Sequence, residues 1–180
     1  ALQAMRGLGL ATAMGIVLNL SPIYPASDDP LDVAKAKLDD GLILRLYMDA
    51  LFKGFYPQDV IEHLGADAPR VHPGDLATIS QPNDFLGVNY YTRNFSSTGN
   101  PWDVHSTGNE VTDMGWEVYP EGFHHTIKRL AQYGLPIYIT ENGSAWPDTV
   151  APDGRIYDPE RERYLMEHLS AAAEAIEAGV

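Results

Sequence analysis

Three short apolar runs, each of strand length, constrain the fold of this chain more than any other feature of its sequence. They lie at residues 15–20 (GIVLNL), 84–92 (DFLGVNYYT) and 135–140 (LPIYIT), and a segment with helical spacing follows each of them along the chain. Strands that are apolar on both faces belong to parallel sheets, because both faces are buried only when helices pack outside or the sheet closes into a barrel. The sequence therefore predicts an α/β fold with the order βα, βα, βα.

Helical spacing predicts one long amphipathic helix over residues 31–54, with Asp28 or Asp29 as its N-cap. Residues 21–30 and the long polar segment 93–119 have no regular period, so we expect loops there. The other predicted helices lie at residues 57–65, 73–81, 120–134 and 158–179.

Two α/β architectures fit three such units, a doubly wound sheet and a (β/α)8 barrel. No strand is followed by the glycine-rich phosphate turn or Walker-type loop of nucleotide-binding sheets, so the (β/α)8 TIM barrel is favoured. In such barrels the chemistry takes place at the carboxyl ends of the strands. The site candidates are the polar and aromatic residues at the three predicted strand ends: Asn19, Ser21, Asn89, Tyr90, Tyr91, Thr140, Glu141 and Asn142.

Composition excludes several classes of partner and site. The formal net charge is −13 and no cluster of Lys and Arg occurs, so we expect no nucleic-acid partner. The apolar runs are far shorter than the roughly 18–20 residues that span a bilayer, so we expect no membrane association. The absence of cysteine excludes disulfides and thiolate sites, and it is compatible with the cytoplasmic location that we expect. His124 and His125 are adjacent on a predicted helix and point in different directions, which favours surface and packing roles over a shared metal.

Four sequence blocks carry a family resemblance. They are YITENG (138–143), LGVNYYTR (86–93), LNLSPIYPAS (18–27) and DMGWEVYPEG (113–122). In this order and at these predicted structural places, they resemble the family 1 glycoside hydrolases, the β-glucosidases and β-galactosidases that fold as (β/α)8 barrels. The resemblance covers nearly the full chain and implies that the three strands are the fifth, sixth and seventh of the barrel. Ser144 is a departure, because the family more often has an apolar residue there.

The resemblance also implies roles for four residues and implies no cofactor or metal. Glu141 matches the family's catalytic nucleophile, and Tyr91 matches the tyrosine whose hydroxyl contacts it. A nucleophilic carboxylate must stay ionised, and a hydroxyl donor beside it favours the charged form. Asn89, two residues before Tyr91 and on the same face of the strand, resembles a residue near the sugar in the −1 subsite. Trp116 resembles the aromatic platform that packs against the aglycone.

Each of these residues also has a plainer interpretation when the resemblance is set aside. Glu141 could be a solvated loop residue or a helix cap. Asn89 and Tyr91 could close their strand by hydrogen bonding and packing. Trp116, in a loop flanked by glycine, could be a plug that covers the barrel mouth.

The family's acid/base glutamate lies in an Asn-Glu-Pro segment, which this sequence lacks. The pair Asn109-Glu110 is followed by Val111 and is a poor substitute. Two functions therefore remain open. One is a retaining β-glucosidase that acts on terminal β-D-glucosyl residues of a glucoside or oligosaccharide through a covalent intermediate on Glu141. Its acid/base would come from outside this chain. The alternative is a noncatalytic barrel fragment or scaffold module that binds sugar weakly at most.

Both ends of the chain look cut. Ala1 opens inside what reads as the tail of a helix, and Val180 alone follows the last predicted helix. We therefore expect residues 1–180 to form one partial barrel domain. Its two open strand edges predict a need for the remaining barrel segments or for a complementary chain.

Overall fold

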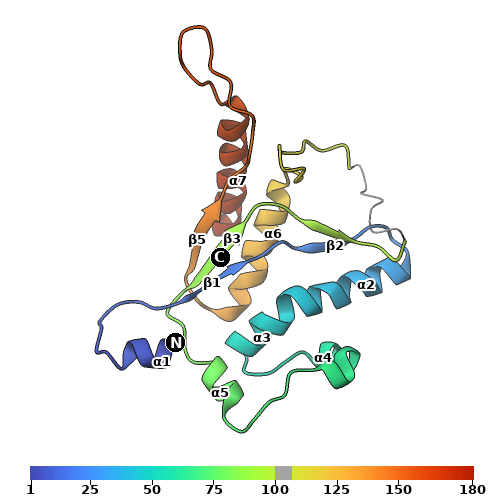
Figure 1. Ribbon diagram of the computed structural model, residues 1–180, viewed down its shortest axis with the longest axis vertical. Coiled ribbons are helices and arrows are strands. Elements are labelled where there is room, and N and C mark those ends of the chain that lie inside the picture. The colour runs from blue at the N-terminus through green and yellow to red at the C-terminus, as the bar shows by residue number, and fades with distance from the viewer. Residues whose placement is uncertain (100–106) are drawn as a thin grey trace. The chain divides into compact units, whose positions relative to one another are not determined.

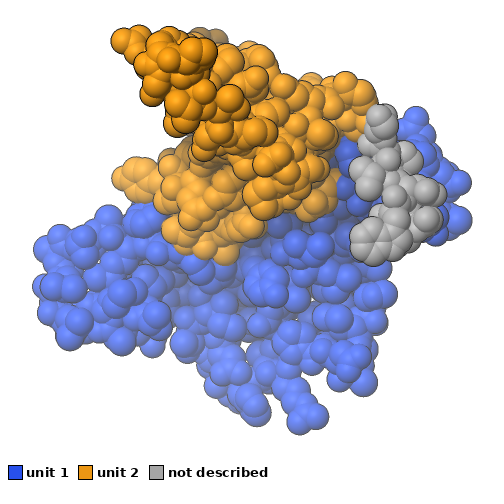
Figure 2. Space-filling view, turned by 45° about the horizontal axis from the view of Figure 1, so that its top comes forward, with its two compact units in different colours: residues 1–16, 23–85, 95–105 blue, residues 17–22, 86–94, 106–180 orange. Residues whose placement is uncertain are grey.

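The computed structural model describes residues 1–99 and 107–180, so part of the expected loop 93–119 lies outside the described residues. The chain divides into two compact units, which Figure 2 shows in different colours. Unit 1 comprises residues 1–16, 23–85 and 95–105, and unit 2 comprises residues 17–22, 86–94 and 106–180. The expectation of one domain over the whole chain stays a prediction.

The three predicted apolar runs form one sheet. Its strands are β1 (Ile16–Asn19), β3 (Leu86–Tyr90) and β5 (Ile137–Asn142), which lie side by side in the order β1-β3-β5 (Figure 1). Strands β3 and β5 are parallel, which confirms the predicted α/β class. Strand β5 extends beyond its predicted end at residue 140, so Glu141 lies within the strand.

The register between β3 and β5 changes just before the site. Val88 pairs with Ile139, whereas the next residue of β3, Asn89, pairs with Glu141. Thr140 is therefore an extra residue on β5, which is a β-bulge. Bulges re-aim the side chains that follow them, and this one brings Glu141 opposite Asn89.

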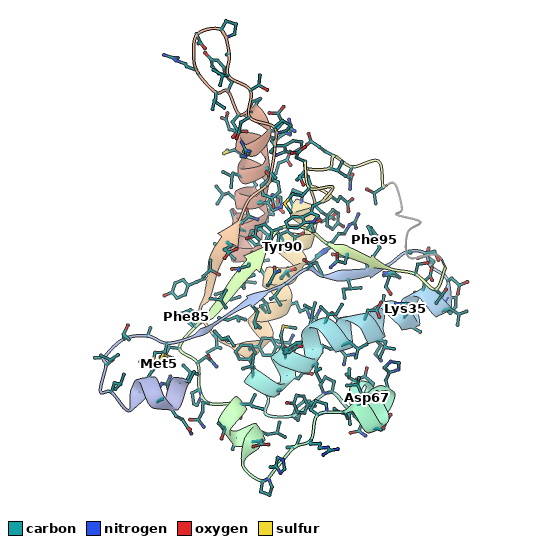
Figure 3. All side chains as sticks on the ribbon, in the orientation of Figure 1. Met5, Lys35, Asp67, Phe85, Tyr90 and Phe95 are labelled. Atoms are coloured by element: carbon teal, nitrogen blue, oxygen red, sulfur yellow. The ribbon has the colours of Figure 1, made fainter. Side chains whose placement is uncertain are left out.

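Two helices of unit 2 pack their aromatic side chains on β3. They are α6 (Pro120–Leu130), continued by a 3₁₀ turn at Ala131–Tyr133, and α7 (Pro159–Glu177). Tyr90, labelled in Figure 3, is fully buried. Its ring centroid lies 5.0 Å from that of Phe123 on α6 and 5.8 Å from that of His168 on α7. These rings form the core beneath the end of β3.

The remaining helices lie in unit 1. The N-cap of its longest helix is Asp29, whose Oδ1 accepts a hydrogen bond of 2.8 Å from the backbone N–H of Leu31, and Pro30 follows as the first helical residue. This confirms one of the two predicted caps. The helices are α1 (Leu2–Arg6), α2 (Pro30–Asp40), α3 (Leu46–Phe52), α4 (Gln58–Leu64) and α5 (Asp75–Ile79), with a 3₁₀ turn at Gly65–Asp67.

The prediction of one regular helix over residues 31–54 is wrong in its middle. Residues Gly41–Arg45 form a π-helical segment between α2 and α3. Arg45 donates to Asp40, five residues earlier, at 3.1 Å and to Asp59 at 2.7 Å. A spacing of five residues matches the i→i+5 geometry of a π turn, and the ion pair with Asp59 holds the guanidinium there.

The prediction that residues 21–30 and 93–119 are loops throughout is also wrong. Strands β2 (Ile23–Pro25) and β4 (Asn94–Ser96) form a second, two-stranded sheet. Each is only three residues long, which is too short for an alternating pattern to be recognised in the sequence. Among the described residues no helix is both long and apolar enough to cross a membrane.

Candidate active site

The structure brings Glu141 and Tyr91 together at the carboxyl ends of β5 and β3. The Tyr91 hydroxyl donates a hydrogen bond to Oε2 of Glu141. This bond, together with partial burial and the carboxylate's charge, raises the pKa of Tyr91, so the phenol stays a donor. Glu141 is exposed, so its carboxylate is accessible from solvent. An accessible carboxylate with a fixed donor is suited to nucleophilic attack, although the role itself stays a prediction.

Asn89 lies opposite Glu141 and is oriented by the bulge residue. The Thr140 hydroxyl donates to Oδ1 of Asn89 at 2.6 Å. An amide whose oxygen accepts this bond directs its NH₂ end, with two donors, away from Thr140. The arrangement suits Asn89 to donate to a sugar hydroxyl or to a carboxylate.

Trp116 lies beside Tyr91 in unit 2. The two ring centroids are 5.5 Å apart and the ring planes are inclined by 48°. Trp116 is 37% exposed, so part of the indole face can contact a ligand. An isolated antiparallel β-bridge between Val111 and Glu117 closes the loop that carries Trp116. The backbone carbonyl of Trp116 accepts a hydrogen bond of 2.8 Å from the N–H of Thr112.

An ion pair that sequence reasoning missed fixes this loop to the segment after β3. Arg93 donates to the Glu117 carboxylate through Nε at 2.7 Å and Nη2 at 2.9 Å. Thr107 and Asn109 each donate to the same carboxylate at 2.6 Å. Burial works toward a higher pKa for Glu117, but the hydrogen bonds from Arg93, Thr107 and Asn109 outweigh it and lower the pKa. The sequence signal was that Glu117, next to Trp116, has no Lys or Arg within four residues that could pair with it.

A second arginine fixes the loop that follows Glu141. Arg161 on α7 donates to the carbonyls of Ser144 at 3.1 Å and Trp146 at 2.7 Å. The Trp146 indole N–H in turn donates to the Ser144 hydroxyl at 2.9 Å. The departure at Ser144 therefore has a local structural reason, because an apolar residue could not accept this bond.

The two adjacent histidines lie on α6. His124 is half-buried, with Nδ1 3.2 Å from the carbonyl of Ala171, and His125 is exposed. Their ring planes are inclined by 72°. In the part of the chain that the structure describes, no group of three or more His, Cys, Asp or Glu could hold a metal.

Comparison with known proteins identifies the family of this arrangement. Residues 1–180 match the family described as Glycosyl hydrolase family 1. Beta-glucosidase A of Acetivibrio thermocellus is 37% identical over 191 aligned positions, which cover 100% of this chain and 43% of that protein.

Solved structures give the same result. The GH1 β-glucosidase of Exiguobacterium antarcticum B7 superposes with a TM-score of 0.88 at 38% identity, covering 99% of this chain and 42% of that one. A psychrophilic β-glucosidase of Micrococcus antarcticus superposes with a TM-score of 0.88 at 39% identity, covering 100% and 45%. The predicted fold class, part of a TIM barrel, is confirmed. The chain spans less than half the length of these relatives.

Proposed function

Because the chain belongs to glycosyl hydrolase family 1, we propose that it supplies the nucleophile of a retaining β-glucosidase. The observation that carries this proposal is the hydrogen bond from Tyr91 to Glu141 at the ends of two neighbouring parallel strands. The carboxyl ends of barrel strands are where such barrels do their chemistry. The substrate is a β-glucoside or a β-linked oligosaccharide.

In the proposed reaction the Glu141 carboxylate attacks the anomeric carbon of the sugar. The glycosidic C–O bond breaks, and the leaving oxygen takes a proton from a second carboxylic acid about 5–5.5 Å away. The resulting covalent glycosyl-enzyme is then hydrolysed by a water, which gives its proton to that second carboxylate. Tyr91 orients the Glu141 carboxylate by donating a hydrogen bond to its Oε2.

Asn89 and Trp116 are the proposed sugar contacts. Asn89 directs its amide donors away from Thr140, and Trp116 offers a partly exposed aromatic face beside Tyr91. Aromatic faces pack against the C–H face of a sugar, which supports Trp116 as the proposed contact for the aglycone. The cytoplasmic location remains a proposal, and the absence of cysteine is compatible with it.

The acid/base residue is proposed to come from outside this chain, because the sequence has no Asn-Glu-Pro segment. The partner that would supply it is the rest of the barrel, on the same polypeptide or on a complementary chain. Without that partner a glucoside with a poor leaving group has no proton donor, and the chain would be a noncatalytic fragment.

A chimera tests the proposal with both carboxylates present. Residues 1–180 replace the matching segment of the Acetivibrio thermocellus β-glucosidase A, which they align with over their full length. We expect the folded chimera to hydrolyse an aryl β-glucoside, and Glu141→Gln to lower kcat at least about 10³-fold, as loss of a nucleophile does.

The matched control is Glu177→Gln, an exposed glutamate near the end of α7. It should leave kcat unchanged. A chimera that is folded but inactive, or one that keeps its activity in the Glu141→Gln variant, would refute the proposed role.

A further inference from the structure

Tyr164 on α7 is a buried residue that contacts the backbone of the proposed site. The residue is 1% exposed, and its hydroxyl donates to the backbone carbonyl of Tyr91 at 2.9 Å. Tyr91 is the residue whose own hydroxyl donates to Glu141. The buried Tyr164 hydroxyl therefore fixes the backbone of Tyr91, the residue whose side chain donates to Glu141.

The same hydroxyl contacts the residue next to Glu141. Nδ2 of Asn142 lies 3.3 Å from the Tyr164 oxygen and donates to the carbonyl of Tyr90 at 2.9 Å. Tyr164 thus accepts from the end of β5 while it donates to the end of β3. One oxygen atom connects the two strand ends that carry Tyr91 and Glu141.

The position of the Tyr164 ring is itself fixed. It stacks on the His168 ring with centroids 3.8 Å apart and planes inclined by 21°. His168 is fully buried, and its Nδ1 lies 2.7 Å from the Tyr164 carbonyl, one helical turn earlier. Burial raises the pKa of Tyr164 to about 12, so its hydroxyl stays protonated and able to donate. A ring with so little freedom holds its oxygen in one place.

We propose that Tyr164 is a positioning residue that sets the Tyr91–Glu141 hydrogen bond by holding the ends of β3 and β5 through Tyr91 and Asn142. Its importance for catalysis rests on the proposed function, whereas the geometric claim concerns only the state of Tyr91. Without the hydroxyl, the Tyr91 carbonyl loses its donor, and the Asn142 amide keeps only its hydrogen bond to the Tyr90 carbonyl. The end of β3 then shifts and Tyr91 no longer meets Glu141 at the same distance.

The test follows the Tyr91 phenol directly by NMR of the 180-residue chain labelled at the tyrosine ¹³Cζ. The Tyr91 resonance is assigned by its loss in Tyr91→Phe, and Glu141→Ala gives its position when the bond to the carboxylate is absent. We expect Tyr164→Phe, which keeps the ring and its stacking, to move the Tyr91 resonance most of the way to the Glu141→Ala position at pH 7. An unmoved resonance in a folded Tyr164→Phe chain would overturn the proposal.

A second variant and a packing control separate positioning from general stability. Asn142→Ala removes the amide bridge while the Tyr164 ring stays in place, and it should move the Tyr91 resonance in the same direction. Phe123→Leu loosens the same aromatic core without touching the Tyr164 hydroxyl, so it should lower Tm and leave the resonance where it is. If Phe123→Leu moves the resonance as much as Tyr164→Phe does, the effect is one of packing and the proposal fails.

The NMR result and the chimera result are independent. In the chimera, Tyr164→Phe should lower kcat roughly tenfold with little change in KM, since about 1.4 kcal/mol of alignment is lost in the transition state. Failure of the chimera with the NMR shift intact would refute the proposed function alone. A functional chimera with no NMR shift would refute only the positioning role.

Discussion

At the scale of single residues, the bulge at Thr140 explains how the side chains of Asn89 and Glu141 come to lie on paired positions of β3 and β5. Its extra residue lets Glu141 pair with Asn89, and its hydroxyl donates to the Asn89 amide oxygen at 2.6 Å. Thr140 therefore determines which end of the Asn89 amide points away from Thr140, whereas an amide without this bond could adopt either orientation.

Thr140→Val removes this hydroxyl and keeps the shape of the side chain. We expect kcat/KM of the chimera for an aryl β-glucoside to fall about tenfold, because a hydrogen bond of this kind contributes about 1 kcal/mol or slightly more. Thr140→Ser keeps the donor and should restore most of the activity. Equal losses in the Val and Ser variants would show that the methyl group, and not the hydroxyl, matters.

At the scale of elements, the segment that carries Trp116 depends on one carboxylate. Glu117 accepts hydrogen bonds from Arg93, Thr107 and Asn109, and the side chains of the Arg93–Glu117 pair are each 11% exposed. The Arg93 guanidinium also lies 3.5 Å from the centre of the Tyr119 ring. A nearly buried ion pair with this many donors holds a loop more firmly than an exposed pair does.

We expect Glu117→Gln to destabilise the chain by about 1–2 kcal/mol at pH 7, which corresponds to a Tm lower by roughly 2–8 °C. The folded chain holds the pKa of Glu117 below its ordinary value. The stabilisation is therefore complete above that ordinary value, about 4.3, and is lost as the pH falls through the lower folded pKa.

Thermal unfolding of both proteins from pH 7 down to pH 3 measures this dependence. The difference in Tm between the original chain and Glu117→Gln should begin to shrink as the pH falls below the ordinary pKa of about 4.3, because the carboxylate of the unfolded chain is protonated first. Glu177→Gln serves as the exposed control and should differ little at any pH. A Tm difference that stays constant down to pH 3 would contradict the ionic role of Glu117.

At the scale of the whole molecule, the three-stranded sheet has two edges that the described residues leave unpaired. β1 and β5 are the outer strands of the order β1-β3-β5, and Ile139 on β5 is 40% exposed. Open edges of apolar parallel strands are sites of association. This supports the proposal that further barrel segments pair with these strands.

The edge strands give a prediction about association. We expect sedimentation of the 180-residue chain to show assemblies that grow with concentration, whereas the chimera, whose outer strands have neighbours, should sediment as one species. A chain that remains a monomer at high concentration would argue against exposed edges.

Local sequence patterns were enough to predict the strands of the main sheet and the start of one helix. The apolar runs predicted the three strands, and Asp28 or Asp29 predicted a helix start, which lies at Asp29. The π segment was not predictable in this way, because no local pattern marks it and a contact of its last residue, from Arg45 to Asp59, joins residues 14 positions apart. The short strands β2 and β4 are too brief to carry a pattern.

The candidate site was likewise predicted only in part from the sequence. Motifs drew attention to Glu141 and Tyr91, and the structure places them in contact. Tyr164 could not be found, because in the sequence it is one more ring on the buried face of a helix. Only the tertiary structure shows that its hydroxyl meets the ends of β3 and β5.

The most direct test of the central claim, that Glu141 is the nucleophile, is the mass of the peptide that contains it after reaction with a 2-deoxy-2-fluoro-β-glucoside bearing a good leaving group. Such a leaving group needs little acid assistance, so both the 180-residue chain and the chimera can be treated. The account predicts a fluoroglucosyl adduct on Glu141 that is absent from Glu141→Gln. An adduct on another residue of this chain, or a reactive chimera whose Glu141 peptide stays unmodified, would contradict it.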